Sequence, residues 1–284
     1  MPHGRRRPRA AGNRRPDNRR AHNCRSALAP ATGIGQSGAL LDAFPGVDLC
    51  DQVEPADWLR ASLRPWTDRQ LLHVSSLVPV DYPAHGRILH RARSRSRDVR
   101  WGDIAAVTGQ PLRAETRYNQ LVGWHPDAHH QTPPWPWGQP NPGSLLPDEC
   151  AAVAEVLAGR TTTPDECWFC LWDGYGTGWP VLNRLGERAP RVALEHRNCL
   201  LFRGPVAAAT AFSSQPWFQS PTWWWPTDRA WCVASELDIF STYVAAAPAT
   251  LRALMEHPTL EVLECTAEQE IDPSPYPPRH DKDR

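Results

Sequence analysis

The sequence predicts an α+β fold with a mainly antiparallel sheet and several short helices. Three observations support this prediction. Short apolar, β-branched or aromatic segments alternate along the chain with amphipathic helical segments. Some strand-like segments follow one another across short polar turns, as they do in hairpins. The 30 prolines among 284 residues restrict regular structure, so we expect short elements and long loops.

Composition divides the chain into three regions. Residues 1–50 are rich in Arg, Pro, Gly and Ala and lack periodicity, so we expect a disordered basic tail. Residues 51–266 carry the regular patterns and are expected to form a single α+β domain. Residues 267–284 are Pro-rich and charged, which predicts a disordered C-terminal tail.

The elements expected in the first half of the domain are short. A Pro in the first turn favours a helix at its start, and a glycine favours its end. We expect helices at 55–63, 101–107 and 114–122, a strand at 71–80 that 82–89 extends or pairs, and an Arg/Ser loop at 91–97.

The second half begins with a long loop expected at 124–144, where prolines prevent regular structure. Its tryptophans indicate that the loop packs against another part of the protein or a partner. The strongest helix follows at 147–157, where Asp148 and Glu149 suit the positive end of the helix dipole. The remaining expected elements are strands at 167–172, 230–237 and 260–264, a strand pair at 192–194 and 199–202, and a helix at 248–256.

The charge of the chain is unevenly distributed, although the formal net charge is zero. Residues 1–26 hold nine Arg and one Asp, about +8, and the rest of the chain balances them. Such a tail could neutralise phosphates of a nucleic acid. Only the tail supports that partner, so we favour a solvated tail instead. The sequence has no apolar run long enough for a membrane span and no signal-peptide core, which predicts a cytoplasmic protein without a membrane partner.

Four motifs of the chain are long enough to be specific: WWPTDRAWCVASELD at 224–238, STYV at 241–244, VRWGDIAAVTG at 99–109 and CWFCLWDGYG at 167–176. Together they resemble a bacterial family of GC-rich genomes that has no assigned activity. The resemblance covers roughly residues 55–265 and implies the boundaries of the domain. In that family a Gly-Gly-Ser turn follows TYV, whereas this chain has Ala245-Ala246-Ala247.

A cluster of tryptophans is the most informative part of the chain. Trp223, Trp224, Trp225 and Trp231 cannot all lie on one face of a strand. Tryptophan packs well in cores, and its ring also stacks on sugars, bases and cations. We therefore expect some of these rings to pack inward and others to form a recognition surface.

Charged residues near the tryptophans form a candidate site with them. Glu236 and Asp238 lie two positions apart on the expected strand, so their carboxylates share a face. With Asp228 and Arg229 they could form an acid–base or metal site, or they could be paired structurally or solvated at the strand end.

Other potential ligand residues give weaker signals. Cys167 and Cys170 form an isolated CxxC inside an aromatic strand, where residues three apart point to opposite faces, so we interpret them as core thiols. His125, Asp127, His129 and His130 match no known metal signature and are interpreted as a surface loop. Nucleotide-binding and hydrolase motifs are absent from the sequence, and we expect no cofactor and no metal ion.

The sequence thus predicts a non-catalytic binding module whose Trp-lined surface engages a protein or a small ligand. The alternative is a hydrolase that uses Asp228, Glu236 and Asp238. The sequence does not distinguish oligomeric states.

Overall fold

The computed structural model describes residues 44–66, 72–94, 97–123, 137–174, 189–194, 197–213 and 219–271. The fold is α+β, as predicted, and every strand pair in these ranges is antiparallel. Most of the two predicted tails lies outside the described residues.

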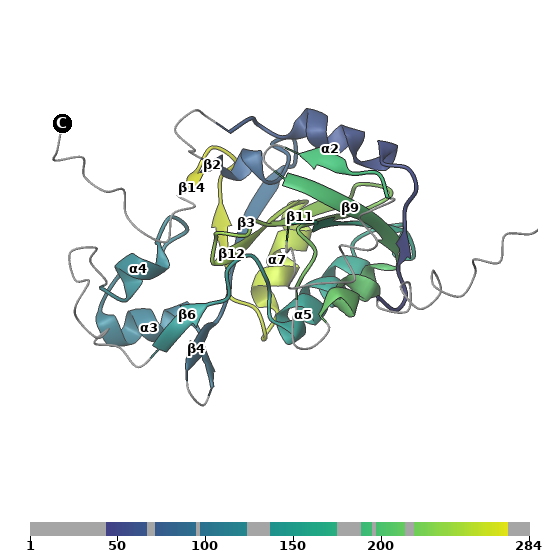
Figure 1. Cartoon of the computed structure of the whole chain (residues 1–284). Coiled ribbons are helices and arrows are strands. Elements are labelled where there is room, and N and C mark those ends of the chain that lie inside the picture. The colour runs from purple at the N-terminus through teal and green to yellow at the C-terminus, as the bar shows by residue number, and fades with distance from the viewer. Residues whose placement is uncertain are drawn as a thin grey trace, which may run out of the picture.

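A nine-stranded sheet forms the centre of the molecule (Figure 1). Its order is β1-β9-β7-β10-β11-β12-β3-β13, and β8 also pairs with β9. The strands are β1 (Asp48–Leu49), β3 (Ala84–Leu89), β7 (Cys167–Trp172), β8 (Val192–Leu194), β9 (Arg197–Gly204), β10 (Trp223–Pro226), β11 (Trp231–Ser235), β12 (Ser241–Ala246) and β13 (Val262–Cys265).

One face of the sheet is covered by α5 (Pro147–Ala158), α7 (Pro248–Glu256) and the 3-10 helix η5 (Val206–Phe212), as Figure 1 shows. The side chains between these helices and the sheet form the helical-face core. Its buried aromatic members are Phe44, Phe169, Phe202, Phe212, Trp224 and Trp231.

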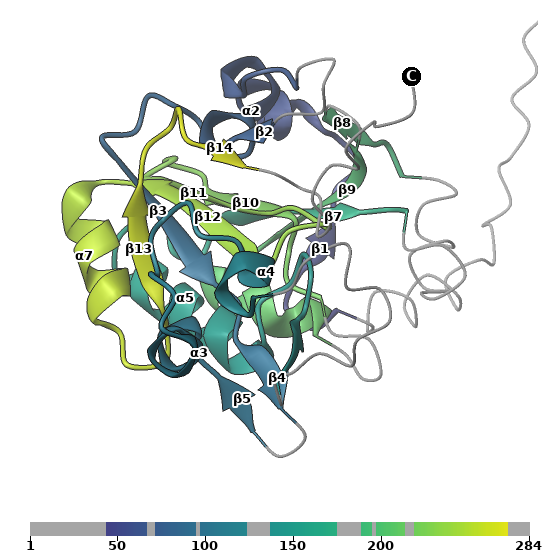
Figure 2. The ribbon, with the colours of Figure 1, turned by 90° about the vertical axis from the view of Figure 1, so that its left-hand side faces the viewer.

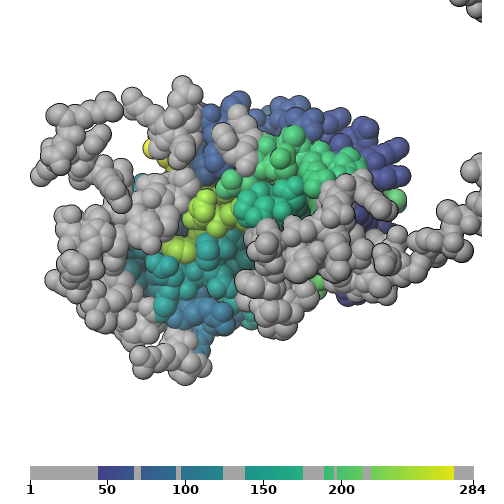
Figure 3. All heavy atoms as spheres, in the orientation of Figure 1, coloured from purple at the N-terminus to yellow at the C-terminus, as the bar shows by residue number. Residues whose placement is uncertain are grey.

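The other face packs against η1 (Glu54–Ala56), α2 (Asp57–Ser62), η2 (Val74–Ser76) and a two-stranded sheet of β2 (Leu72–His73) and β14 (Glu270–Ile271). The side chains here form the opposite-face core. Its buried members include Leu59, Leu77, Trp223, Trp225 and Tyr243. In the space-filling view, the purple atoms of the N-terminal described range adjoin the green atoms around β8 and β9 (Figure 3).

A third group of elements forms a side unit next to β3 (Figure 2). It contains a sheet of order β5-β4-β6 and two helices. These are β4 (Ala92–Ser94), β5 (Asp98–Val99), β6 (Trp137–Pro140), α3 (Trp101–Thr108) and α4 (Tyr118–Leu121). Its side core is made of Leu89, Ala92, Val99, Trp101, Ile104, Tyr118, Leu121 and Val122.

Local sequence signals account for the elements that were predicted correctly. Pro147 begins α5, and Glu149 accepts a hydrogen bond of 2.9 Å from the Leu146 N–H at the start of that helix. Gly109, in the left-handed conformation with φ of 70°, ends α3. The predicted helices at 55–63 and 248–256, the strands at 167–172, 230–237 and 260–264, and the 192–202 strand pair are also present.

The prediction of a strand at 71–80 is wrong beyond its first residues. After β2 the chain turns into η2, because the Ser76 hydroxyl accepts a hydrogen bond of 3.3 Å from the His73 N–H. A serine hydroxyl that bonds the nearby backbone competes with strand pairing. The segment is nevertheless buried, which explains its apolar character.

Two further predictions in the side unit need correction. The helix expected at 114–122 is confined to α4, because Arg87 binds the carbonyl oxygens of Ala114 and Thr116 and holds that stretch out of helical geometry. Residues 92–94 of the expected loop form β4. Strand β12, for which the sequence analysis assigned no element, lies between β11 and β3.

Packed structure also extends beyond the predicted limits of 51–266. Phe44 and Val47 are buried in the helical-face core, and Asp48 pairs with Arg203 between β1 and β9. At the other end, Ile271 of β14 pairs with Leu72. Composition alone does not reveal these segments, because their few apolar residues lie next to long polar stretches.

Candidate functional site

The four tryptophans of the predicted recognition surface are all enclosed in the protein. Trp223, Trp224, Trp225 and Trp231 are at most 2% exposed. Alternation along the strands sends Trp224 and Trp231 into the helical-face core, and Trp223 and Trp225 into the opposite-face core. The predicted Trp-lined surface at 223–231 is therefore wrong, because the sheet is covered on both faces.

Four other tryptophans, Trp58, Trp66, Trp168 and Trp172, are half-buried. Each has an arginine guanidinium over its ring. The pairs are Arg229 over Trp58 at 4.8 Å, Arg203 over Trp168 at 5.6 Å, and Arg197 over both Trp66 at 5.7 Å and Trp172 at 5.5 Å. Cation–π contact of this kind stabilises by about 0.5–1 kcal/mol at exposed sites. A face of each ring is thus covered by an arginine side chain of the protein itself.

Asp228 and Arg229 belong to the turn between β10 and β11. The carboxylate of Asp228 accepts hydrogen bonds of 2.7 Å from the hydroxyls of Thr161 and Thr162 and from the Thr162 N–H. These bonds lower the pKa of Asp228 even though burial opposes them. Arg229 has a left-handed φ of 53° and accepts a hydrogen bond from Tyr82 through its carbonyl. Both residues therefore shape the turn.

Glu236 and Asp238 lie beyond the far end of β11, where both carboxylates contact one nitrogen of Arg197. Glu236 is buried, and its Oε1 pairs with Arg197 Nη2, whereas Asp238 is exposed and lies 3.4 Å from the same atom. Burial raises the pKa of Glu236, and Arg197 partly offsets that rise. The two carboxylates therefore lie near each other, but they do not share a face of a strand as predicted, because β11 ends at Ser235.

The third carboxylate of the predicted site is far away. Asp228 precedes β11 and Glu236 follows it, and a five-residue strand spans about 17 Å at 3.3 Å per residue. The three carboxylates therefore do not share a site. The proposed hydrolase constellation of Asp228, Glu236 and Asp238 is wrong as a unit, because its members lie at opposite ends of one strand.

The remaining candidate ligands do not form a metal site among the described residues. Cys167 and Cys170 are buried in the helical-face and opposite-face cores, as predicted, and burial raises the pKa of both thiols. His125, Asp127, His129 and His130 lie outside the described residues. No helix in the described ranges is long and apolar enough to span a membrane.

A chain of hydrogen bonds joins His90, Thr242 and Ser235 on the helical face of the sheet. The His90 Nε2 atom lies 2.9 Å from the Thr242 hydroxyl, which lies 2.6 Å from the Ser235 hydroxyl. All three residues are at most 1% exposed. Because no substrate can reach it, this arrangement of a hydroxyl and an imidazole is structural.

A pocket of about 380 Å³ lies where the opposite-face core meets the side core. We call it the side pocket. Arg87 of β3 and Trp101 of α3 lie in it, together with residues of three segments, 115–120, 238–243 and 269–271. Sequence reasoning found only Asp238 of this lining, since the segments are distant in sequence and converge only in the fold.

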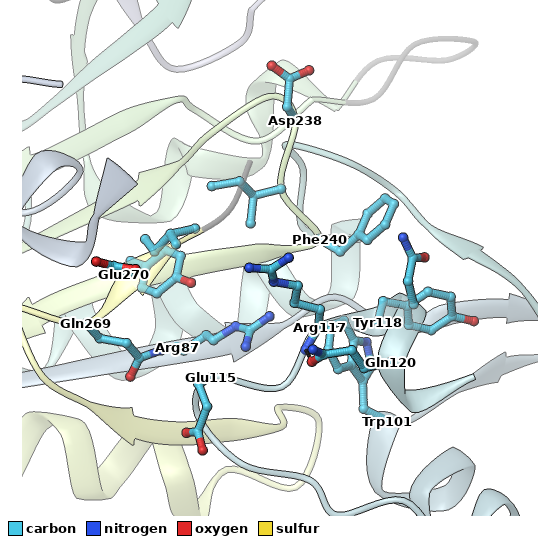
Figure 4. A pocket seen from close by; sticks show the side chains of 14 residues that line it. Arg87, Trp101, Glu115, Arg117, Tyr118, Gln120, Asp238, Phe240, Gln269 and Glu270 are labelled. Atoms are coloured by element: carbon cyan, nitrogen blue, oxygen red, sulfur yellow. Dashed lines mark hydrogen bonds between the residues drawn. The ribbon is translucent and has the colours of Figure 1, made fainter. Parts of the chain in front are cut away.

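The side pocket combines aromatic and charged side chains. Trp101, Tyr118 and Phe240 contribute rings that also contact one another, with centroids 5.3 Å apart for Trp101 and Tyr118 and 5.8 Å for Tyr118 and Phe240. Burial raises the pKa of Tyr118 and of Tyr243, so both phenols stay neutral at physiological pH. Figure 4 shows the side chains of Arg87 and Arg117 pointing into the pocket.

Searches against protein-family models, curated proteins and solved structures find no match to this chain. The resemblance described from the sequence motifs therefore stays a prediction.

Proposed function

We propose that this protein is a non-catalytic binding module that holds a small ligand in the side pocket. The observation that carries the proposal is the pocket itself. Its volume of about 380 Å³ falls in the range of small-ligand sites, which typically measure about 300–1,000 Å³. Aromatic rings beside a few converging polar groups are also typical of such sites.

Two observations favour binding over hydrolysis. Among the described residues that line the side pocket there is no His, Cys, Ser or Thr side chain to act as a nucleophile or an imidazole base. Burial raises the pKa of three glutamates, Glu149, Glu236 and Glu261, and none of them lines the pocket. The ligand partner of the original prediction is retained, but its site moves from the tryptophan cluster to the side pocket.

A pair of tryptophan insertions tests the proposal. Asn119 is half-buried in the pocket wall, so Asn119→Trp should fill the space that a ligand would occupy. Val107 on α3 is 72% exposed and does not line the pocket, so Val107→Trp is the matched control. A chemically mixed library of small molecules is screened by thermal shift, and hits are measured by calorimetry.

The expected result is a set of compounds that bind the wild type and Val107→Trp equally and bind Asn119→Trp at least about tenfold more weakly. The proposal fails if the library yields no ligand, or if every ligand binds Asn119→Trp as tightly as the control.

A further inference from the structure

Arg87 is the most deeply buried charged group of the side pocket. It is only 6% exposed and lies on β3, opposite Tyr243 of β12. Its guanidinium carbon lies 5.2 Å from the centre of the Trp101 ring. The side chain is thus fixed between the sheet and the side unit, with its charged end at the pocket.

The positive charge of Arg87 has no carboxylate partner in the described part of the chain. Its Nε donates to the Ser241 hydroxyl at 2.8 Å, and its Nη1 donates to the carbonyl oxygens of Ala114 and Thr116 at 2.6 and 2.8 Å. The Nη2 atom donates no hydrogen bond to any of the described residues. All the partners are uncharged, so the charge itself is uncompensated, and a buried charge without a counter-ion is costly.

A second guanidinium reaches the same space from the opposite wall. Arg117 precedes α4, and Figure 4 shows its guanidinium and that of Arg87 pointing toward the same part of the pocket. The carboxylates of Glu115, Asp238 and Glu270 point away from them. Two guanidinium groups that point into one space favour an anion over a cation there.

These contacts identify the chemical class of ligand. Guanidinium groups bind carboxylate and phosphate through paired hydrogen bonds, and such charge-assisted bonds are short and strong. The rings of Trp101, Tyr118 and Phe240 lie beside the two arginines and suit a flat apolar body. The neutral phenol of Tyr118 adds no negative charge that would repel an anion.

We propose that the side pocket binds a small organic anion, with its carboxylate or phosphate between Arg87 and Arg117 and its apolar part against the aromatic wall. This inference rests on the proposed function and names its ligand class. Arg87 also anchors the 114–116 backbone to the sheet, so substitution there affects folding as well as binding. Arg117 is exposed and is the better residue to change.

The test uses three probes of similar shape on the full chain: phenylacetate, its neutral analogue phenylacetamide, and phenyl phosphate. Calorimetry and ligand-observed NMR measure their affinities for the wild type and for Arg117→Gln. Arg113→Gln is the matched control, because Arg113 is an exposed arginine of the same segment that does not line the pocket.

We expect at least one of the two anions to bind the wild type about tenfold or more tightly than phenylacetamide does. Arg117→Gln should weaken that binding about tenfold or more, and Arg113→Gln should change it less than twofold. The tighter of phenylacetate and phenyl phosphate identifies the anionic group.

Equal affinity for phenylacetamide and the anions would overturn the inference and leave the binding module intact. Equal weakening by Arg113→Gln would likewise reject it, since the effect would then be a general one of surface charge. If none of the three probes binds at about 10 mM, the inference fails, while the library screen decides the proposed function separately.

Discussion

The indole nitrogen of Trp223 donates a hydrogen bond of 2.8 Å to the carbonyl oxygen of Leu77, and this bond joins the large sheet to η2. The adjacent Trp224 is equally enclosed, but its indole nitrogen has no hydrogen-bond partner in the described residues. The two neighbours share strand, size and burial, but they lie in opposite cores and differ in whether the indole nitrogen is hydrogen-bonded.

Replacing each ring with phenylalanine separates packing from hydrogen bonding. Trp223→Phe should lower the free energy of unfolding by about 1–3 kcal/mol more than Trp224→Phe does, because it leaves the Leu77 carbonyl unsatisfied. Trp224→Phe removes an unpaired donor together with ring volume. Urea denaturation of both variants measures the difference. A greater loss for Trp224→Phe would mean that ring packing outweighs the hydrogen bond.

The stability of the protein should depend on pH through His90. Its Nδ1–H donates a hydrogen bond of 2.8 Å to the carbonyl oxygen of Asn141. Burial lowers the pKa of this histidine to about 4. An unfolded histidine has a pKa near 6.5, so the unfolded state binds the proton more readily. The free energy of unfolding should therefore fall as the pH falls from about 6.5 toward 4, by up to about 3 kcal/mol.

The His90→Gln variant provides the control for this pH dependence. It should be less stable than the wild type at pH 7.5, but its stability should fall less steeply between pH 6.5 and 4. Denaturation at a series of pH values measures both slopes. Parallel slopes would show that other groups account for the acid sensitivity.

The start of α3 depends on a carboxylate that is distant in sequence. Glu261 accepts hydrogen bonds of 2.7 Å from the N–H groups of Trp101 and Gly102. Glu261→Ala removes both acceptors and should cost about 1–2 kcal/mol of stability, as the loss of a helix cap does. Glu264→Ala, in the neighbouring strand at an exposed position, should change stability by less than about 0.5 kcal/mol. Equal effects in thermal unfolding would argue against the cap.

Two glycines with the same backbone conformation should differ in their tolerance of alanine. Gly143 and Gly109 have φ of 66° and 70°. A Cβ on Gly143 would lie 2.6 Å from the Cα of Leu237, whereas one on Gly109 would meet nothing within 4 Å. Gly109→Ala should lower the free energy of unfolding by about 1–2 kcal/mol, because alanine is strained in the left-handed conformation.

Gly143→Ala adds a backbone clash to this strain and should cost at least about 1 kcal/mol more than Gly109→Ala. Chemical denaturation compares the two. Similar costs would mean that the segment around Leu237 moves aside freely.

Helices and hairpins of this fold were predictable where local chemistry determines them. Pro147 and the acids after it mark α5, and the alternation of Cys167 and Cys170 places them in different cores. The prediction of a strand at 71–80 was wrong because a short apolar run indicates burial but does not distinguish a strand from a buried turn. Ser76 resolves that ambiguity through a contact that depends on the folded chain.

The candidate site was less predictable than the fold. The clustered tryptophans were interpreted as a recognition surface. They instead fill the two cores of a sheet that is covered on both faces. Arg87 gave no signal in the sequence, because the residues around it belong to elements distant from β3 in sequence, Trp101 to α3 and both Ser241 and Tyr243 to β12. Glu236 and Asp238 do lie together, but not for the predicted reason, because β11 ends at Ser235 and it is Arg197 that contacts both carboxylates.

The pairing of β3 with β12 also determines how this chain must fold. Arg87 and Ser241 bond across 154 positions of sequence. A ribosome adding about 5–20 residues per second would need about 8–30 s to make the intervening chain. During that time the nascent β3 has neither of its neighbouring strands. Topologies that depend on such distant contacts fold slowly, within about milliseconds to seconds after release. Because of this strand order, the growing polypeptide must be protected from aggregation until β12 and β13 have been made.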